Sequence, residues 1–159
     1  MMSVLIDVDG VMTDGTFWYT EDGKAMKRFG PDDADALSIL RGYYVIRFVT
    51  ADERGLKITK RRIVNDMGYD LDVVSQHERL DYINANYQMG HTCIYIADGF
   101  LDAPALEAAT YGIAPANAHP YAKRAADHVL RRGGGDRAVA EACNHLLVKF
   151  KNTDLRAQS

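Results

Sequence analysis

Cysteine is scarce in this chain, and long apolar runs are missing from it. Cys93 and Cys143 are the two cysteines among 159 residues, and they form no CxxC pair. Two isolated cysteines do not make the disulfide framework of a small secreted protein, so we expect two buried thiols. The apolar runs are too short to cross a bilayer, and the N-terminal MMSVLIDVDG has no basic segment followed by a long apolar one. These features predict a cytoplasmic protein without a membrane partner.

An excess of basic charge is also missing. The 19 Lys and Arg residues are outnumbered by 22 Asp and Glu residues, which gives a formal net charge of -3. Such a balance provides no general attraction to nucleic acid, so small molecules are the expected partners. The hydrophobic share of 47% and the length are those of one globular domain. We predict a single domain over residues 1–150 and a polar tail over residues 151–159.

Short apolar runs alternate with amphipathic segments along most of the chain. The run Val4-Leu5-Ile6 is typical of a buried strand, and it ends at the polar sequence Asp7-Val8-Asp9-Gly10. Further strands are predicted at residues 44–49, 71–74, 92–97 and 111–114. Helices are predicted at residues 33–41, 56–67 and 79–87, and Gly68 is placed to end the second of them. Strands that alternate with helices favour an α/β fold with a mainly parallel sheet.

A turn sequence interrupts this alternation after the first strand. Residues 17–19 and 25–29 flank Glu21-Asp22-Gly23, a sequence suited to the turn of a β-hairpin. Trp18 and Tyr19 in the first arm are expected to pack against protein or to line a substrate entrance. The sequence therefore predicts a β-hairpin between the first strand and the first helix.

The last predicted helix follows a run of three glycines. Gly133-Gly134-Gly135 lacks the spacing of a dinucleotide-binding fingerprint and carries no Walker lysine, so we interpret it as a flexible connection. Asp136 is a candidate N-cap for the helix that follows. The predicted buried face of that helix consists of Val139, Cys143, Leu146 and Phe150.

Two carboxylates follow the first predicted strand. Because side chains alternate along an extended segment, Asp7 and Asp9 lie on similar sides of it and can share a task. A carboxylate can attack phosphorus to form an aspartyl phosphate, while a neighbouring carboxyl group protonates the leaving alcohol and then activates water. Asp7 is the candidate nucleophile and Asp9 the candidate acid and base. An isolated Asp-x-Asp more often caps a turn, so the catalytic interpretation of Asp7 and Asp9 needs support from residues further along the chain.

A phosphate reaction at Asp7 requires a cation, because both reactants are anionic. Mg²⁺ held by Asp7 and a second carboxylate would reduce their repulsion. Asp98 and Asp102 come directly after the strand predicted at residues 92–97. Since the carboxyl ends of parallel strands meet at one edge of a sheet, both are candidate members of a metal site.

Two further residues are candidates for phosphate contacts. Thr50 follows the strand predicted at residues 44–49, where its hydroxyl can donate to a phosphate oxygen or serve as a turn residue. Arg79 begins a predicted helix, where its guanidinium can form a charge-assisted fork with phosphate or face solvent. Neither residue alone decides between the two interpretations.

The ordered motifs DVDGVMTDG, Val49-Thr50, Arg79 and ADGFLD resemble those of the haloacid dehalogenase superfamily of phosphatases and phosphotransferases. The segments TFWYTEDGKAMKRF, APANAHPYAKRAADHV and GGGDRAVAEAC are similar, more narrowly, to its 3-deoxy-D-manno-octulosonate 8-phosphate phosphatase branch of sugar-acid phosphatases. The resemblance implies a Rossmann-like three-layer α/β domain with a mainly parallel sheet. It also implies a β-hairpin after the first strand and little or no cap domain.

The resemblance further implies an activity and a set of roles. It implies a Mg²⁺-dependent phosphatase that hydrolyses a phosphorylated sugar or sugar acid through an aspartyl phosphate. It also implies a homotetramer in which hairpins and a neighbouring subunit help to enclose the site. The resemblance implies Asp7 as the nucleophile and Asp9 as the acid and base, with Thr50 and Arg79 binding phosphate. It implies that Mg²⁺ is bound by Asp7, the Asp9 main-chain carbonyl and Asp98, and that Asp102 supports the metal site.

Several positions depart from the pattern of this family. Arg79 stands where a lysine is usual, and Ala97-Asp98-Gly99 replaces the usual Gly-Asp-Asp. Ala51-Asp52 replaces Gly-Arg after Thr50, and Asp32 stands where an arginine is common, which makes Arg54 a candidate substrate contact. These departures leave two alternatives open. One is a catalytically weakened phosphate-sugar-binding or accessory domain in sugar-acid biosynthesis, and the other is a mainly structural oligomer.

Overall fold

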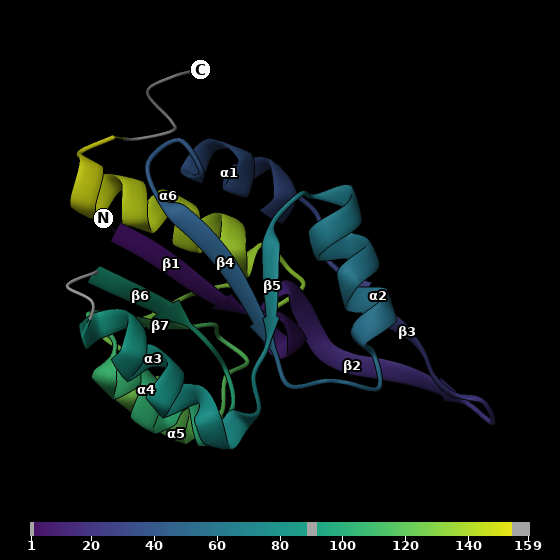
Figure 1. The fold of residues 1–159 in the computed structure, drawn as a ribbon. Coiled ribbons are helices and arrows are strands. Elements are labelled where there is room, and N and C mark those ends of the chain that lie inside the picture. Colours follow the sequence, from purple (N-terminus) through teal and green to yellow (C-terminus); the bar gives the residue numbers. More distant parts are fainter. Residues whose placement is uncertain (1, 89–91, 154–159) are drawn as a thin grey trace.

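The protein is built around one parallel β-sheet. The structure, a computed structural model, describes residues 2–88 and 92–153, and its sheet has the strand order β5-β4-β1-β6-β7-β8 (Figure 1). Every neighbouring pair of strands in this sheet is parallel. The strands are β1 (Met2–Asp7), β4 (Val45–Thr50), β5 (Asp70–Val73), β6 (Thr92–Ile96), β7 (Tyr111–Ala114) and β8 (His128–Val129). The predicted parallel sheet is therefore confirmed.

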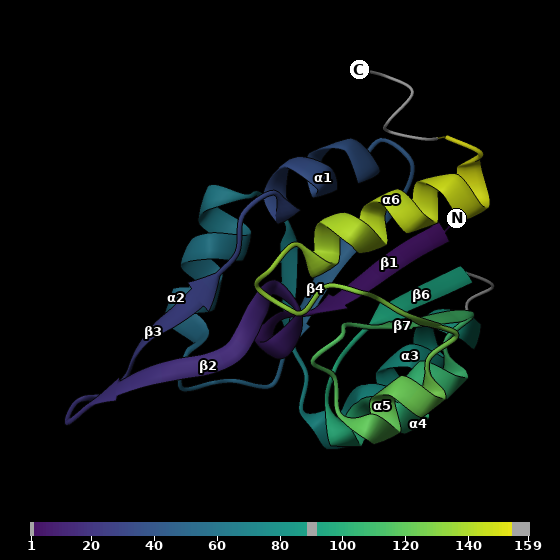
Figure 2. The same ribbon diagram turned by 180° about the vertical axis from the view of Figure 1, so that it is seen from behind.

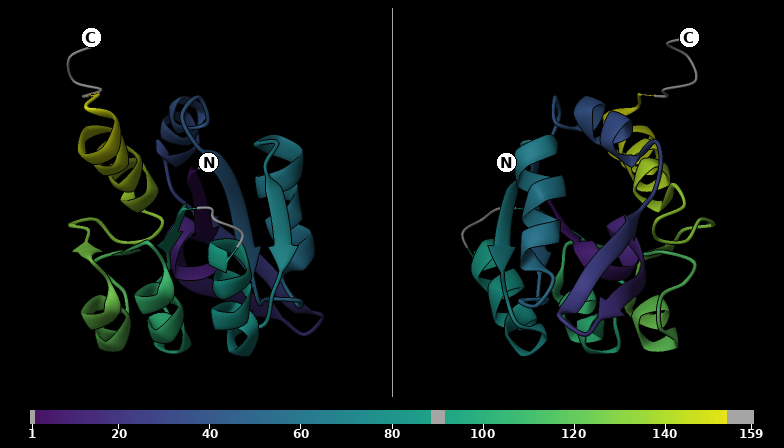
Figure 3. Two further views of the ribbon diagram at one scale, coloured as in Figure 1. Left: turned by 60° about the vertical axis from the view of Figure 1, so that its left-hand side comes forward. Right: turned by 90° about the vertical axis from the view of Figure 1, so that its right-hand side faces the viewer.

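Helices cover both faces of the sheet, as Figures 1 and 2 show from opposite sides and Figure 3 shows from two further directions. One face carries α1 (Asp33–Leu40), α6 (Ala138–Lys151) and α2 (Leu56–Lys60), which continues into a wider helical turn (Arg61–Asp66). The other face carries α3 (Arg79–Gln88), α4 (Ala103–Ala108) and α5 (Pro120–Ala125). Central strand β1 contributes to both cores, because Val4 and Ile6 point to one layer and Leu5 points to the other. The predicted three-layer α/β architecture is confirmed.

A two-stranded hairpin follows β1, as predicted, and residues 2–88 and 92–153 contain no cap domain. It consists of β2 (Thr13–Thr20) and β3 (Gly23–Phe29) and projects from one end of the sheet (Figures 1 and 2). The pairing changes register within it: Trp18 pairs with Met26, but Tyr19 pairs with Lys24, so Ala25 is an extra residue on β3. Such a bulge turns the residues on either side of it relative to one another.

The helix boundaries follow the sequence prediction closely, and the short elements were missed. The helix predicted at residues 56–67 corresponds to α2 and the wider turn after it, and Gly68 ends it with a φ of 72° and an N–H donated to Val64. Strand β8 and helices α4 and α5 were not predicted, because two to six residues carry too little periodicity. The two thiols are buried as expected.

The N-terminus of α6 is capped by a residue from another helix, so the predicted Asp136 cap is wrong. The helix begins after Arg137, which has a left-handed φ of 67° and no side-chain cap. Asp33 on α1 instead accepts a hydrogen bond of 2.8 Å from the Ala140 N–H. Asp136 forms ion pairs with Arg132 and Arg137. The prediction failed because local capping rules do not detect a carboxylate distant in sequence.

The Asp33 carboxyl group makes stability depend on pH. Burial raises its pKa from 3.8 to about 6, although backbone N–H groups at the start of α6 oppose the shift. Between these two values the folded chain binds more protons than the unfolded chain, so this group makes stability fall as pH rises from about 4 to about 6. Asp33→Asn should remove this fall, and its stability relative to the original chain should increase by up to about 3 kcal/mol between pH 4 and pH 8. Denaturant unfolding of both chains at several pH values measures the difference.

The exposed Asp35 on the same helix provides the control for this experiment. Asp35→Asn removes the same charge from α1 without touching α6, so this variant should keep the fall in stability that Asp33 causes between about pH 4 and about pH 6. A parallel pH profile for Asp33→Asn and the original chain would contradict the assignment.

Gly134 and Gly135 pack against the turn after β1, and Gly133 packs against Asn117, so the interpretation of the three glycines as a flexible connection is wrong. A Cβ atom on Gly134 would lie 2.1 Å from the Gly10 carbonyl oxygen and 2.4 Å from that of Thr13. Asn117 closes the contact: its Nδ2 donates to the Gly10 carbonyl, and its Oδ1 accepts from the Gly134 N–H. Glycine is needed here because two backbones meet without room for a side chain.

Gly134→Ala should therefore destabilise the chain by about 1–3 kcal/mol, since backbone atoms must move apart to admit the methyl group. The free energy of unfolding from denaturant titration measures this loss. Gly42→Ala is the matched control, because the nearest atom to its added Cβ is the Ile39 carbonyl oxygen at 3.4 Å. Equal stability of the two variants would contradict the close packing.

Three of the four residues predicted on the buried face of α6 are buried, namely Val139, Cys143 and Leu146, whereas Phe150 near the end of the helix is 37% exposed.

Among residues 2–88 and 92–153, no helix has the length and apolar character needed to span a bilayer. The predicted polar tail lies mostly outside the described residues, since α6 reaches Lys151 and the description ends at residue 153.

Candidate active site

The predicted site residues meet at the carboxyl edge of the sheet. Asp7 is the last residue of β1, Thr50 is the last residue of β4, and Asp98 follows β6. Between β1 and the hairpin the chain makes a turn (Val8–Met12) in which Asp9 and Gly10 depart from helical geometry, and Gly10 has a φ of 88°. A Cβ atom on Gly10 would overlap the carboxylate of Asp98, so glycine allows these two segments to approach each other.

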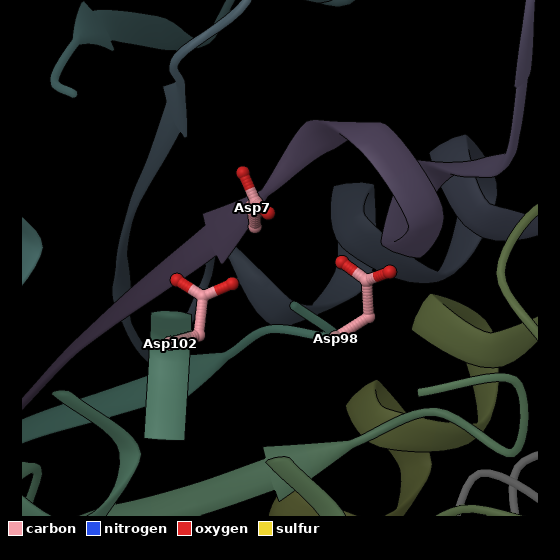
Figure 4. Close-up of side chains that lie close together, drawn as sticks. All are labelled: Asp7, Asp98 and Asp102. Carbon is pink, nitrogen blue, oxygen red and sulfur yellow. The ribbon is translucent and has the colours of Figure 1, made fainter. Parts of the chain in front are cut away.

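Three aspartates form a compact carboxylate cluster at this edge. One oxygen each from Asp7, Asp98 and Asp102 lies within 4.8 Å of the other two. Figure 4 shows Asp7 at the end of its strand, with Asp98 and Asp102 contributed by the segment after β6. Asp7 and Asp102 are almost completely buried. Three converging carboxylates fit a hard divalent cation, which prefers oxygen ligands and offsets their mutual repulsion.

The clustering changes the protonation of its members. Burial raises the pKa of Asp7 well above 3.8, and Arg79 lowers it again in part. Burial, together with the negative charge of the nearby Asp102, raises the pKa of Asp98 to about 7. Both shifts have one cause, which is negative charge held away from water and close to like charge. The cluster therefore requires compensating positive charge.

Arg79 supplies part of that charge from within the protein. Its side chain is 1% exposed, and its Nη2 donates to Asp7 Oδ1 at 3.2 Å. Nη1 donates to the Tyr95 hydroxyl at 2.7 Å, and Nε donates to the Val74 carbonyl. Burial alone would lower the pKa of Arg79, but Asp7 and its other partners raise it above the ordinary value. Arg79 is thus a fixed cation in direct contact with Asp7.

Tyr95 extends this network to Asp102. The Tyr95 hydroxyl donates to Asp102 Oδ1 at 2.7 Å, and the Gly99 N–H donates to Asp102 Oδ2 at 3.0 Å. A side chain at Gly99 would collide with the same carboxylate, because its Cβ would lie 2.6 Å from Oδ2. Glycine at this position of the ADGFLD motif therefore lets Asp102 hold the loop that carries Asp98.

Asp9 stands apart from the cluster and contacts different partners. Its Oδ2 accepts a hydrogen bond of 3.2 Å from the Thr50 hydroxyl, and its Oδ1 lies 2.7 Å from Lys27 Nζ. Lys27 also lies 2.8 Å from Asp52 Oδ2, which pairs with Lys24 as well. Neither lysine was predicted to be a site residue.

A pocket of about 240 Å³ opens above these groups. Asp7, Asp9 and Arg79 line it, so three predicted site residues share one cavity. Thr50 is buried and does not line the pocket, but its hydroxyl donates to Asp9, which does. Arg54 is exposed and does not line this pocket. The remaining lining residues, which the sequence did not assign to the site, are Phe17, Lys24, Ala51, Asp52 and Gln76.

Comparisons with known proteins place this fold and site in a class. No family model matches the chain. A curated 3-deoxy-D-manno-octulosonate 8-phosphate phosphatase, KdsC, from Haemophilus influenzae is 33% identical over 148 residues, which are 91% of this chain and 81% of that protein. The cobalt-bound structure of the phosphatase from H. influenzae has a TM-score of 0.78 at 30% identity, over 91% of this chain and 85% of that one.

A third comparison agrees in fold. The phosphatase of the same name from Moraxella catarrhalis, in complex with magnesium, phosphate and KDO, has a TM-score of 0.79 at 22% identity and covers 95% of this chain and 87% of that one. The fold and the carboxylate site define a phosphoric monoester hydrolase of the haloacid dehalogenase type, whose carboxylate cluster could hold a divalent metal ion. Within that superfamily, the chain belongs to the family of 3-deoxy-D-manno-octulosonate 8-phosphate phosphatases. The predicted resemblance is confirmed.

Proposed function

We propose that this protein hydrolyses the phosphate ester of a 3-deoxy-ulosonate sugar acid, with Mg²⁺ as its cofactor. The observation that carries the proposal is the position of Asp7, which ends β1, lines the pocket and shares a cluster with Asp98 and Asp102. The substrate class rests on the names of the relatives, which are phosphatases acting on a sugar-acid phosphate. Mg²⁺ suits the cluster because it prefers oxygen ligands.

Asp7 is the proposed nucleophile, and Asp9 is the proposed acid and base. An Asp7 carboxylate oxygen attacks phosphorus, and the bond from phosphorus to the sugar oxygen breaks as Asp9 gives that oxygen a proton. Asp9 then takes a proton from water, whose oxygen attacks the aspartyl phosphate and releases phosphate from Asp7. The cation held by Asp7, the Asp9 main-chain carbonyl and Asp98 would neutralise charge on the phosphoryl group.

Thr50 and Arg79 are the proposed phosphate-binding residues. Arg79 Nη2 lies 3.2 Å from Asp7 Oδ1, so it provides positive charge where phosphate must approach that carboxylate. The Thr50 hydroxyl donates to Asp9, and a rotation of its side chain would direct the same donor to a phosphate oxygen. Lys24 and Gln76 line the same pocket and supply donors for the sugar acid. Arg54 remains a proposed contact, which would act from outside this lining.

We further propose a cytoplasmic homotetramer of single-domain chains, each folded over residues 1–150 with a polar tail after it. The hairpin supports assembly, because it exposes the large apolar side chains of Phe17, Trp18, Tyr19 and Met26, and soluble proteins usually cover such a surface. Neither nucleic acid nor a membrane is a proposed partner, in keeping with a net charge of -3. Sedimentation equilibrium of the chain measures the assembly.

Phosphate release tests the proposed activity. The chain is incubated with a panel of sugar phosphates and sugar-acid phosphates, first with Mg²⁺, then with a chelator, and then with excess Mg²⁺ restored. We expect release that stops with the chelator, returns with Mg²⁺ and is fastest for a 3-deoxy-ulosonate phosphate. Binding of these ligands by folded chain without release would favour the alternative, a phosphate-sugar-binding or accessory domain. Failure to bind either Mg²⁺ or phosphate analogues would favour a structural oligomer.

A further inference from the structure

Lys27 of the hairpin lies against the proposed acid and base. Although it belongs to a strand that projects from the domain, its side chain is 0% exposed. Its Nζ lies 2.7 Å from Asp9 Oδ1 and 2.8 Å from Asp52 Oδ2, and it donates to Thr59 Oγ1 at 2.9 Å. An ammonium group has three protons to donate, and these three partners satisfy all of them.

Lys27 also contacts Asp52, a carboxylate that is itself fixed by other hydrogen bonds. Asp52 accepts hydrogen bonds from Lys24 Nζ and, through Oδ1, from the Gly55 N–H. Burial would raise the pKa of Asp52, but its hydrogen bonds to Lys24, Lys27 and Gly55 lower it to about 2. Lys24 is fixed in turn, since its Nζ lies 4.1 Å from the centre of the Phe17 ring. Lys27 is therefore held in place independently of Asp9.

The carboxylate of Asp9 is fixed at both oxygens while it borders the pocket. Lys27 holds Oδ1 and the Thr50 hydroxyl holds Oδ2, yet 31% of the side chain is exposed. When Thr50 turns to bind phosphate, as proposed above, Lys27 becomes the remaining side-chain contact that orients Asp9 among those the structure describes. A proton donor must be aligned with the oxygen that it protonates, so this contact bears on the chemical step.

We propose that Lys27 is a positioning residue, which holds the Asp9 carboxyl group in line with the leaving oxygen of the substrate. The proposal rests on the proposed function, in which Asp9 protonates that oxygen. A second role for Lys27 would be structural, because it also ties the hairpin to the loop at Asp52 and to α2 at Thr59. The two roles predict different dependences on the leaving group.

The first test compares a poor and a good leaving group. Breakdown of a sugar-acid phosphate requires a proton from Asp9, whereas 4-nitrophenolate leaves without one. For Lys27→Met we expect kcat/KM to fall by about 10²-fold or more with the sugar-acid phosphate and by less than about tenfold with 4-nitrophenyl phosphate. An equal fall with both substrates would overturn the proposal. Lys57→Met removes an exposed lysine of α2 and should change neither value.

The second test asks whether Lys27 acts through Asp9. In the Asp9→Asn background, Lys27→Met should cause little further loss of kcat/KM with the sugar-acid phosphate, because the group that it positions is already gone. A loss as large as in the original chain would mean that Lys27 acts independently of Asp9. Should Lys27→Met fold poorly, Lys27→Gln keeps a donor for Thr59 without the charge, and the same expectations apply to it.

A third measurement requires no turnover and separates this proposal from the proposed function. Crystal structures of the original chain and of Lys27→Met, both with inorganic phosphate bound so that Thr50 turns away from Asp9, show directly where the Asp9 carboxylate lies. We expect Asp9 to change its rotamer in the variant, and an unchanged Asp9 would overturn the positioning role. If the original chain releases no phosphate from either substrate, the proposed function fails, while this structural comparison still decides whether Lys27 orients Asp9.

Discussion

Asp7→Asn should reduce phosphate release by about 10⁴-fold or more, because an amide does not attack phosphorus as a carboxylate does. The asparagine has nearly the same shape, and its Oδ1 can still accept from Arg79 and from the Val8 N–H. The loss is therefore expected in turnover rather than in folding. Steady-state phosphate release with Mg²⁺, together with circular dichroism of both chains, measures the two properties separately.

The covalent intermediate and the residual activity of the variant together test whether Asp7 is the nucleophile. An aspartyl phosphate formed by the original chain should be trapped by acid quenching with radiolabelled substrate, and the variant should form none. Asp35→Asn, an exposed substitution on α1, controls for the general effect of removing a carboxylate. Metal-dependent release by Asp7→Asn at the original rate would exclude Asp7 as the nucleophile.

Arg79→Met should lower the free energy of unfolding by about 3–5 kcal/mol, since it removes one partner from a buried ion pair. Asp7 would lose its buried counter-charge, and the Tyr95 hydroxyl and the Val74 carbonyl would lose their donor. Mg²⁺ places positive charge on the same carboxylates, so it should restore part of the lost stability. Denaturant unfolding with Mg²⁺ and with chelator measures both effects.

Arg79→Lys is the matched comparison for this prediction. A lysine keeps the charge but cannot present the planar fork that reaches Asp7, Tyr95 and Val74 together. Its stability should fall between those of Arg79→Met and the original chain. If Arg79→Met were as stable as the original chain without metal, the guanidinium would not be the charge that balances the cluster.

The sequence predicted those parts of the site that depend on strand ends. Asp7, Thr50 and Asp98 could be placed together because the carboxyl ends of parallel strands share one edge of a sheet. Asp102 followed from its short distance in sequence to Asp98. Local patterns of apolar residues and turns also predicted the parallel sheet and the hairpin, whereas the three-layer architecture was implied by the family resemblance.

The hairpin lysines escaped prediction because of a bulge. In a regular strand, residues 24 and 27 point to opposite faces, so alternation alone would separate Lys24 from Lys27. The extra residue at Ala25 changes this relation, and both ammonium groups reach Asp52. The packing of Gly134 on Gly10 was missed for a similar reason, since it joins segments that have no common pattern in the sequence.

Because β1 is a central strand of the sheet, the candidate site at its end is completed late during synthesis of the chain. Ser3 pairs with Val45 on one side and with Cys93 on the other, so the first strand to be made waits for partners from much later in the chain. The turn after it is completed later still, when Gly134 packs on Gly10. A nascent chain that ends before Gly134 therefore carries Asp7 and Asp9 without the packing that completes this turn. The chain should therefore need nearly full synthesis before it binds substrate, in keeping with the slow folding of topologies dominated by distant contacts.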